Sequence, residues 1–473
     1  IISRMSVRNP THIGVVVNKI LNYEKATDMD DDWYETVSLV SDPYDSGIST
    51  VITNEYIEEM LDEYGMETIN TKYNGNSYAS WMENQFNGGT LYMNYRGYYG
   101  ASGFDYDDVM GDLYNYTKHP FATFLTCDTG SFDSGTYCLS ETLLRSGTPG
   151  APVGAVAAIG TATIYTHTAF NNIINMGIYE GIFIEDNFTA GEAVAYGKLV
   201  LYNTYPNNPN NNINLFSYWN NLMGDGSTHL WTKRPELITA NHVSSIQPGT
   251  NFIDIEVLNS NNSPVKDAYV TLLKGNDEIF KTVLTDVTGN ASIDLEYVTF
   301  GEVHLTVIKQ NYKPIESSFQ IVQSANNANV SFDNISIDDS VGELTTGNND
   351  GILNPGERVI VNIPIENLGN NNLQNLQGTL ISNNQDDLVS IVSSLNNYGS
   401  LSLGETSFGN NSYVVELSPS FTQIDDLDLR LSISDGEDEW SSLINLNLDA
   451  GFLVFDSFEL INGSQLSPGE DAY

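Results

Sequence analysis

Three stretches between residues 89 and 172 carry residue types that nucleophilic chemistry uses. Each is an apolar run that ends in a glycine, threonine, cysteine or histidine and continues into a polar loop: GTLYMNYRGYYGASGF, FATFLTCDTGSFDSGTYC and GAVAAIGTATIYTHTAF. Ligands of open α/β sheets bind outside the carboxyl ends of the strands, so we expect Gly97, Cys127 and residues 161–167 to converge. A cysteine just past a strand, near backbone N–H groups and a helix start, is a candidate nucleophile. On spacing alone, the competing interpretation is a small buried side chain that only packs.

Hydrophobic patterning predicts the elements that position these residues. Residues 1–236 read as α/β, because helix-like stretches alternate with short apolar runs. The helix-like stretches are 11–25, 54–64 and 189–203, and the apolar runs include 89–94, 121–126 and 153–160. The run VGAVAAIG at 153–160 is small and uniformly apolar, as is typical of a strand buried on both faces of a parallel sheet.

The hydrophobic pattern of the sequence changes near Pro235. Residues 240–323 contain short alternating segments (FIDIEVL, AYVTLLK, ASIDLEY, EVHLTVIK) separated by turn signals, which predict a β-sandwich. A second sandwich is predicted over 327–449, with VIVNIPIENL and LDLRLSIS among its strands. Residues 450–473 are too short to stand alone and are interpreted as the start of a further module. The opening IISRMSVRNP lacks the order of a signal peptide, so we expect that it follows a processed or omitted portion.

The combination NYRG, C-x-TG-x-F, C-x-x-E and GAVAxIG, in this order, resembles the gingipain-type cysteine peptidases. ISRMSVRNP, VNKILNYEK and LMGDGSTHLWTKRP agree, so the resemblance covers residues 1–236. It implies a caspase-like α/β catalytic domain followed by immunoglobulin-like domains, with the N-terminal strands of the catalytic domain missing. It also implies a bacterial cysteine endopeptidase that acts on proteins or peptides and is exported to the exterior or held on the cell surface.

The resemblance assigns roles residue by residue. Cys127 matches the nucleophile, and the segment through Gly97 leads into the catalytic histidine. At that next position this chain has Tyr98, followed by Tyr99 where a glycine is usual. A Cys–His peptidase needs an imidazole to deprotonate the thiol and protonate the leaving amine, and a phenol with a pKa near 10 is a poor substitute.

Two interpretations follow from the tyrosine. In the first, His167 in YTHTAF replaces the missing base and faces Cys127, although a histidine between two threonines also fits a structural role. In the second, peptidase activity is lost, and the fold serves as a cell-surface adhesin or a structural or filament component. Its partners would then be other surface proteins, further copies of the chain included.

Several further residues belong to the same hypothesis. The N–H groups of Cys127 and of residues 97–100 would be the oxyanion donors. Cys138 is expected to pack at a helix start, and a disulfide between Cys138 and Cys127 would abolish nucleophilicity. Glu141 is interpreted as a first-turn acid or as an orienting group. Family members that cut after basic residues place an acid in the specificity pocket, and the candidates here are Asp105, Asp128 and Asp133.

Charge excludes some classes of partner. The 473 residues contain 18 Lys and Arg against 61 Asp and Glu, a net charge of −43. Nucleic acids and anionic membranes are therefore excluded as expected partners, and the longest apolar runs are too short to span a bilayer. Such an excess of like charge needs screening or bound cations, which favours a saline or calcium-rich exterior.

Acidic loops suggest calcium as a cofactor, because calcium prefers oxygen ligands. The stronger candidate resembles the Asx- and Gly-rich loops of extracellular sandwich modules and comprises Asp338, Asp339, Asn348, Asp350, Asn354 and Glu357. The weaker candidate is the TDMDDDW segment with Asp28, Asp30 and Asp32, for which an exposed acidic loop is an equal explanation.

Overall fold

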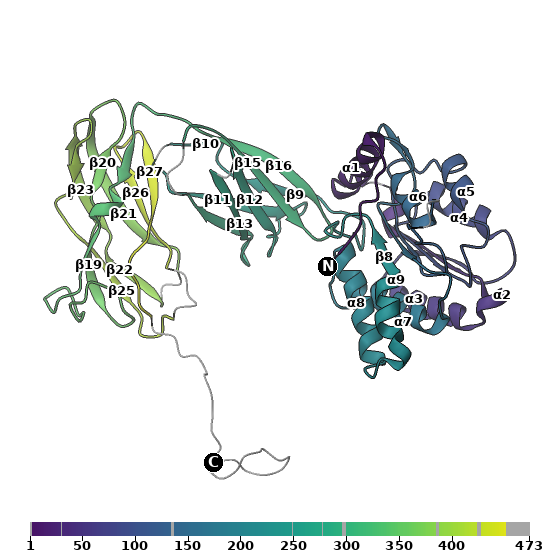
Figure 1. Cartoon of the computed structure of the whole chain (residues 1–473). Helices are drawn as coiled ribbons and strands as arrows, with labels where there is room; N and C mark the ends of the chain where they lie inside the picture. Colours follow the sequence, from purple (N-terminus) through teal and green to yellow (C-terminus); the bar gives the residue numbers. More distant parts are fainter. Residues whose placement is uncertain are drawn as a thin grey trace, which may run out of the picture.

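The computed structural model describes residues 2–29, 31–133, 137–247, 249–276, 278–295, 299–384, 387–422 and 427–450. Figure 1 shows three bodies in a row: an α/β body with the N-terminus, a middle body of strands, and a third body of strands. The helix α9 ends at Trp219, and the described regular elements after it are strands apart from one short 3-10 turn. This change from α/β to β structure confirms the coarse fold prediction. The predicted module over 450–473 lies, apart from Ala450, outside the described residues.

A six-stranded sheet forms the centre of the first body, in the order β2–β1–β3–β4–β7–β8. Its strands are β1 (Thr36–Ser41), β2 (Thr68–Lys72), β3 (Tyr92–Arg96), β4 (Phe121–Phe124), β7 (Ala157–Thr161) and β8 (Asn220–Met223). Neighbouring strands from β2 to β7 are parallel, and β8 is antiparallel to β7. The carboxyl ends of five strands therefore lie at one edge of the sheet.

Helices cover both faces of this sheet. Alternate side chains of each strand point to opposite faces, so Tyr92 and Phe121 pack with α3, α7 and α8, whereas Met93 and Ala122 pack with α4, α5 and α6. The helices are α1 (Pro10–Glu24), α2 (Pro43–Ser46), α3 (Ser49–Tyr64), α4 (Tyr78–Gly88), α5 (Tyr106–Gly111), α6 (Leu139–Arg145), α7 (Thr168–Phe183), α8 (Ala190–Thr204) and α9 (Asn212–Trp219). Two short strands, β5 (Gly147–Thr148) and β6 (Ala151–Pro152), form a hairpin near α1.

Local signals in the sequence explain where these helices begin. Asn9 accepts a hydrogen bond from the N–H of His12 and precedes a proline at the first position of α1. Thr189 and Glu192 form a capping box at the start of α8. No helix among the described residues combines the length and the apolar character that crossing a bilayer requires.

The middle body consists of two sheets that enclose one apolar core. Its strands are β9 (Ile238–Asn241), β10 (Ser245–Ile246), β11 (Phe252–Asn259), β12 (Tyr269–Lys274), β13 (Ile279–Leu284), β14 (Asn290–Asp294), β15 (Gly301–Lys309) and β16 (Tyr312–Ile321). One sheet has the order β10–β16–β15–β12–β13 and the other β14–β11–β9. This arrangement fits the predicted sandwich, and its immunoglobulin-like character stays a prediction.

The third body is built from three sheets around a second β core. Its strands are β17 (Ala328–Val330), β18 (Ser336–Asp338), β19 (Arg358–Asn362), β20 (Ile365–Asn367), β21 (Leu373–Ser382), β22 (Val389–Ser393), β23 (Leu395–Leu401), β24 (Thr406–Ser407), β25 (Tyr413–Leu417), β26 (Leu429–Ser434) and β27 (Glu439–Ile444). The expected single strand VIVNIPIENL is wrong, because Pro364 lacks an N–H and separates β19 from β20, which belong to different sheets.

Side chains join the three bodies at two places. At the tip of the β15–β16 hairpin, Asn311 is buried and exchanges two hydrogen bonds with Thr232 of the first body, at 2.8 and 3.0 Å. At the other joint, the Asn251 side chain donates to Leu443 O and accepts from Leu443 N, both at 2.8 Å. Arg430 of β26 also pairs with Asp254 of β11.

Candidate active site

The loops after β3, β4 and β7 meet at the carboxyl edge of the sheet. Gly100 N donates to Cys127 O at 3.0 Å, and Thr126 Oγ1 donates to Gly100 O at 2.6 Å, which joins the first two loops. Asp128 N donates to Thr163 O at 2.9 Å and joins the second loop to the third. The Gly100 N–H, one of the predicted oxyanion donors, is therefore already used inside the protein.

Glycines of the sequence motifs allow this close packing. A Cβ at Gly130 would lie 2.5 Å from the carbonyl carbon of Gly160, and a Cβ at Gly160 would lie 2.7 Å from Gly130 N. The C-x-TG and GAVAxIG motifs thus share one physical cause, which is direct contact between the backbones of β7 and of the loop after β4. Gly97 is constrained as well, because a Cβ there would overlap the Tyr95 hydroxyl.

Cys127 lies in the centre of these loops and is 5% exposed. Its Sγ lies 2.7 Å from Thr166 Oγ1, so the neighbour of the thiol is a hydroxyl group. Cys138 is the N-cap residue of α6, and both cysteines are free thiols, which is at odds with the disulfide alternative. Burial raises the pKa of Cys138, so this thiol packs in the protonated form.

The two tyrosines after Gly97 lie on the surface. Tyr98, at the position where the family has its histidine, is 59% exposed. The Tyr99 hydroxyl donates to Asp128 Oδ2 at 2.9 Å, and this hydrogen bond is the main cause that raises the pKa of Tyr99. The Tyr99 phenol therefore stays protonated at neutral pH and cannot accept a proton from a thiol.

None of the six histidines, all of which lie in the described residues, makes a hydrogen bond with Cys127. His167 caps α7: its Nδ1 accepts from Ala169 N at 3.2 Å, and its ring contacts Phe170. His119 is buried before β4, at the opposite edge of the sheet, and burial holds its pKa well below the usual value. The use of His167 as a base stays a prediction.

Arg96 and Thr166 are residues near the thiol to which the sequence reasoning gave no role. Arg96 ends β3, is 1% exposed, and donates to Asn172 Oδ1 and to backbone carbonyls on both sides of the site. Both residues belong to segments that the sequence analysis identifies, NYRG and YTHTAF. A basic residue at the last position of a strand buried on both faces was the signal that could have identified Arg96.

The acids Glu141, Asp105 and Asp128 have separate roles. Glu141 is buried and pairs with Arg145 at 3.2 Å, with Arg8 at 3.6 Å and with the Ser6 hydroxyl, so its contacts are structural. Asp105 is the N-cap of α5 in a capping box. Asp128 adopts a left-handed backbone conformation with φ of 71° directly after Cys127.

The predicted calcium loop folds around a buried acid. Asp339 is 2% exposed, and its carboxylate accepts from the N–H groups of Asp350 and Gly351 at 2.8 and 3.1 Å. Glu357 accepts from Asn354 N at 3.1 Å, and the Asn348 amide donates to Asp350 Oδ2 at 2.9 Å. These acceptors are therefore engaged with loop donors, and a calcium ion there stays a prediction. Asp338 accepts hydrogen bonds from the N–H and the hydroxyl of Ser340.

Among the described residues, the acids of the second predicted metal segment contact separate partners. Asp28 accepts from the Thr117 hydroxyl, whereas Asp32 pairs with Arg234 at 2.5 Å. Asp30 lies outside the described residues.

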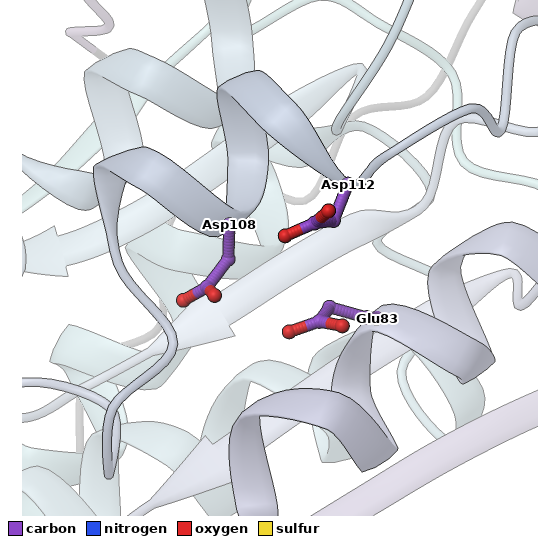
Figure 2. Close-up of side chains that lie close together, drawn as sticks. All are labelled: Glu83, Asp108 and Asp112. Carbon is purple, nitrogen blue, oxygen red and sulfur yellow. The ribbon is translucent and has the colours of Figure 1, made fainter.

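A different acidic cluster lies between α4 and the C-terminal end of α5. Figure 2 shows Glu83, Asp108 and Asp112 pointing toward one another, and their carboxylate oxygens lie within 4.8 Å. Burial, followed by the charges of Asp108 and Asp112, raises the pKa of Glu83. No motif in the sequence indicated this contact, because it depends on how the two helices pack.

The first body is an α/β domain with a buried cysteine at the carboxyl edge of its sheet, where open α/β sheets bind their ligands. Residues 1–231 match peptidase family C25, and this part of the chain is similar to the gingipain-type cysteine peptidases, as the sequence predicts.

Curated relatives include Lys-gingipain W83 of Porphyromonas gingivalis, 22% identical over 67% of this chain and 19% of the relative. Gingipain R2 of the same species is 26% identical over 34% of this chain and 23% of its own length. The crystal structure of the Arg-specific cysteine proteinase gingipain R superposes with a TM-score of 0.59 and 22% identity, over 68% of this chain and 74% of that one. The last match shows a shared fold, and the chain spans about a fifth of the length of the curated relatives.

Proposed function

We propose that this chain is a secreted or surface-held bacterial protein whose C25 domain has lost peptidase activity and serves as an adhesive or structural module. One observation carries the proposal: the hydroxyl of Thr166, and not an imidazole, is the partner of the Cys127 thiol. The residue at the family's histidine position, Tyr98, is exposed.

Peptide hydrolysis needs two proton transfers at this site. A base must take the thiol proton, and the resulting acid must return it to the leaving amine. A threonine hydroxyl does neither at neutral pH, and the Tyr99 phenol is held protonated by Asp128. A positioned general base contributes about 10²- to 10⁴-fold to the rate, so the domain is expected to lack useful turnover.

Charge supports an extracellular location. A net charge of −43 strains the folded chain by self-repulsion unless salt or cations screen it, and exterior fluids supply both. The partners would be other surface proteins or further copies of the chain, bound through its three bodies.

The proposal is tested by incubating the full chain with a mixed peptide library and detecting products by mass spectrometry. We expect no cleavage by the unaltered chain and a gain of cleavage in the double variant Tyr98→His/Tyr99→Gly, because it restores the family's residues. The triple variant that adds Cys127→Ala serves as the control and should lose the gain. Cleavage by the unaltered chain that Cys127→Ala abolishes would reject the proposal.

An active cysteine endopeptidase is the second candidate, and the retained thiol together with the position of His167 favours it. Thr166 contacts Cys127, so the next residue in the chain, His167, lies close by and is exposed. Rotation of the ring away from Ala169 N would free its Nδ1 for the thiol. In that case the unaltered chain cleaves the library and His167→Ala abolishes cleavage.

A further inference from the structure

Arg96 is a buried cation without an acidic partner. Its Nε and Nη2 donate to Asn172 Oδ1 at 3.0 and 2.5 Å, Nη2 also donates to Thr168 O at 3.4 Å, and Nη1 donates to Leu125 O. No carboxylate in the described ranges forms an ion pair with it. A buried charge that lacks a counter-ion is costly, and hydrogen bonds to carbonyls offset only part of that cost.

Arg96 donates hydrogen bonds to the backbone on both sides of the thiol site. Leu125 precedes Cys127 by two residues, and Thr168 follows Thr166, the hydroxyl neighbour of the sulfur, by two residues. Burial lowers the pKa of Arg96 to about 9, and the neighbouring Tyr95 and Cys127 act in the opposite direction. The guanidinium therefore remains charged at pH 7, and it is hydrogen-bonded to the backbone two residues before Cys127.

The start of α7 adds a second source of positive potential. This helix has 16 residues and begins at Thr168, two positions after the residue that contacts Cys127. A helix N-terminus carries about half a positive charge. Cysteines beside an arginine or at a helix N-terminus favour the thiolate form. Three other titratable groups lie nearby: Tyr99 and Asp128 bind each other, and His167 caps α7.

We propose that Arg96 is a positioning residue that fixes the backbone on both sides of Cys127 and stabilises the thiolate of Cys127 in place of an imidazole. The site then keeps a reactive sulfur but lacks the proton donor that an amine leaving group requires. The inference rests on the proposed function, since it presumes that no imidazole pairs with the thiol. Its test measures sulfur reactivity and not peptide cleavage, so the two can fail separately.

The test is the rate of alkylation of Cys127 by iodoacetamide at pH 6 and pH 9, followed by peptide mass spectrometry on the full chain. The ratio of the two rates cancels the effect of burial on access to the sulfur. An ordinary thiol such as glutathione reacts about 200-fold more slowly at pH 6 than at pH 9. A fixed opposite charge lowers this ratio of rates about tenfold or more. The alkylation of Cys127 is therefore expected to be less than about 20-fold slower at pH 6 than at pH 9.

Three variants separate charge from structure. Arg96→Gln should raise the factor toward about 200-fold, with only the contribution of the α7 N-terminus left, Arg96→Lys should retain most of the effect, and His167→Ala should leave the factor unchanged. Cys138 reports folding in the same sample, because it is 5% exposed and becomes reactive when the domain unfolds. A wild-type factor equal to that of glutathione overturns the proposal whether or not the variants fold. A factor that Arg96→Gln leaves unchanged, or that His167→Ala abolishes, overturns it as well.

Discussion

Replacing Gly160 with alanine tests the contact that explains two sequence motifs. The new Cβ would lie 2.7 Å from Gly130 N and from the carbonyl group of Thr129, all of which are backbone atoms. Carbon atoms pack at about 3.5 Å or more, so the loop after β4 has to move by most of an ångström. That loop is held by Gly130 N to Thr161 O at 3.1 Å and by Thr161 N to Thr129 Oγ1 at 3.1 Å.

The size of the effect follows from these contacts. Overpacking a close-packed site costs about 1–3 kcal/mol, and weakening one buried hydrogen bond costs about 1 kcal/mol more. Alanine recovers about 0.5 kcal/mol by restricting the unfolded chain. Gly160→Ala is therefore expected to lower the free energy of unfolding of the first body by about 2–3 kcal/mol.

Urea unfolding followed by tryptophan fluorescence measures this change, because Trp33, Trp81, Trp219 and Trp231 all lie in the first body and only Trp440 lies elsewhere. Gly150→Ala is the matched control: a Cβ there meets nothing within 4 Å, so its effect should stay within about 0.5 kcal/mol. Equal unfolding midpoints for Gly160→Ala and Gly150→Ala would show that the backbone contact between β7 and the loop does not exist.

Three further predictions concern titration and ions. Burial, then the Lys19 charge, holds the pKa of His119 below its usual 6.5, so the unfolded chain binds the proton more readily. The stability of the first body should therefore fall as the pH drops below about 6.5. In the His119→Gln variant, the melting temperature should fall less between pH 7.5 and pH 5 than in the unaltered chain. Equal slopes of melting temperature against pH for the two chains would contradict this. Because the pKa of Glu83 is raised in the folded state, protonated Glu83 favours folding at low pH, and this contribution to stability is lost as the pH rises through the raised pKa. Glu83→Gln should therefore stabilise the first body by about 0.5 kcal/mol at pH 7.5 but not at pH 4, unlike the exposed control Glu67→Gln. If the loop around Asp339 holds calcium, excess EDTA should lower the calorimetric melting temperature of the third body, and an unchanged melting curve would exclude a structural ion.

The α/β architecture was predictable because its signals are local. The buried run VGAVAAIG at 153–160 overlaps β7, and the predicted helix at 189–203 corresponds to α8, whose capping box can be read from the sequence. The helix α7 was not predicted. Its sequence TAFNNIINMGIYEGIF mixes asparagines with apolar residues, because several of these asparagines are buried on the side that faces the sheet.

The composition of the site was less predictable than its location. Cys127 was identified from its place after a strand and from family resemblance, but the contact with Thr166 depends on how the loop after β7 folds back. Sequence proximity suggested His167 as a base, whereas its Nδ1 faces the N–H of Ala169. Pairings such as Arg96 with Asn172 join residues 76 positions apart, and only the packing of α7 on β3 brings them together.

The two joints between the bodies transmit mechanical force along the chain. Asn311 and Asn251 each form a pair of hydrogen bonds with a neighbouring body, so a pull on the distal sandwich is transmitted to the α/β domain through short, directional contacts. Opening of either joint lengthens both hydrogen bonds of its pair, because both bonds join the same two residues. Along the row of bodies in Figure 1, the chain is expected to behave as a stiff arm that keeps its α/β domain at a constant reach.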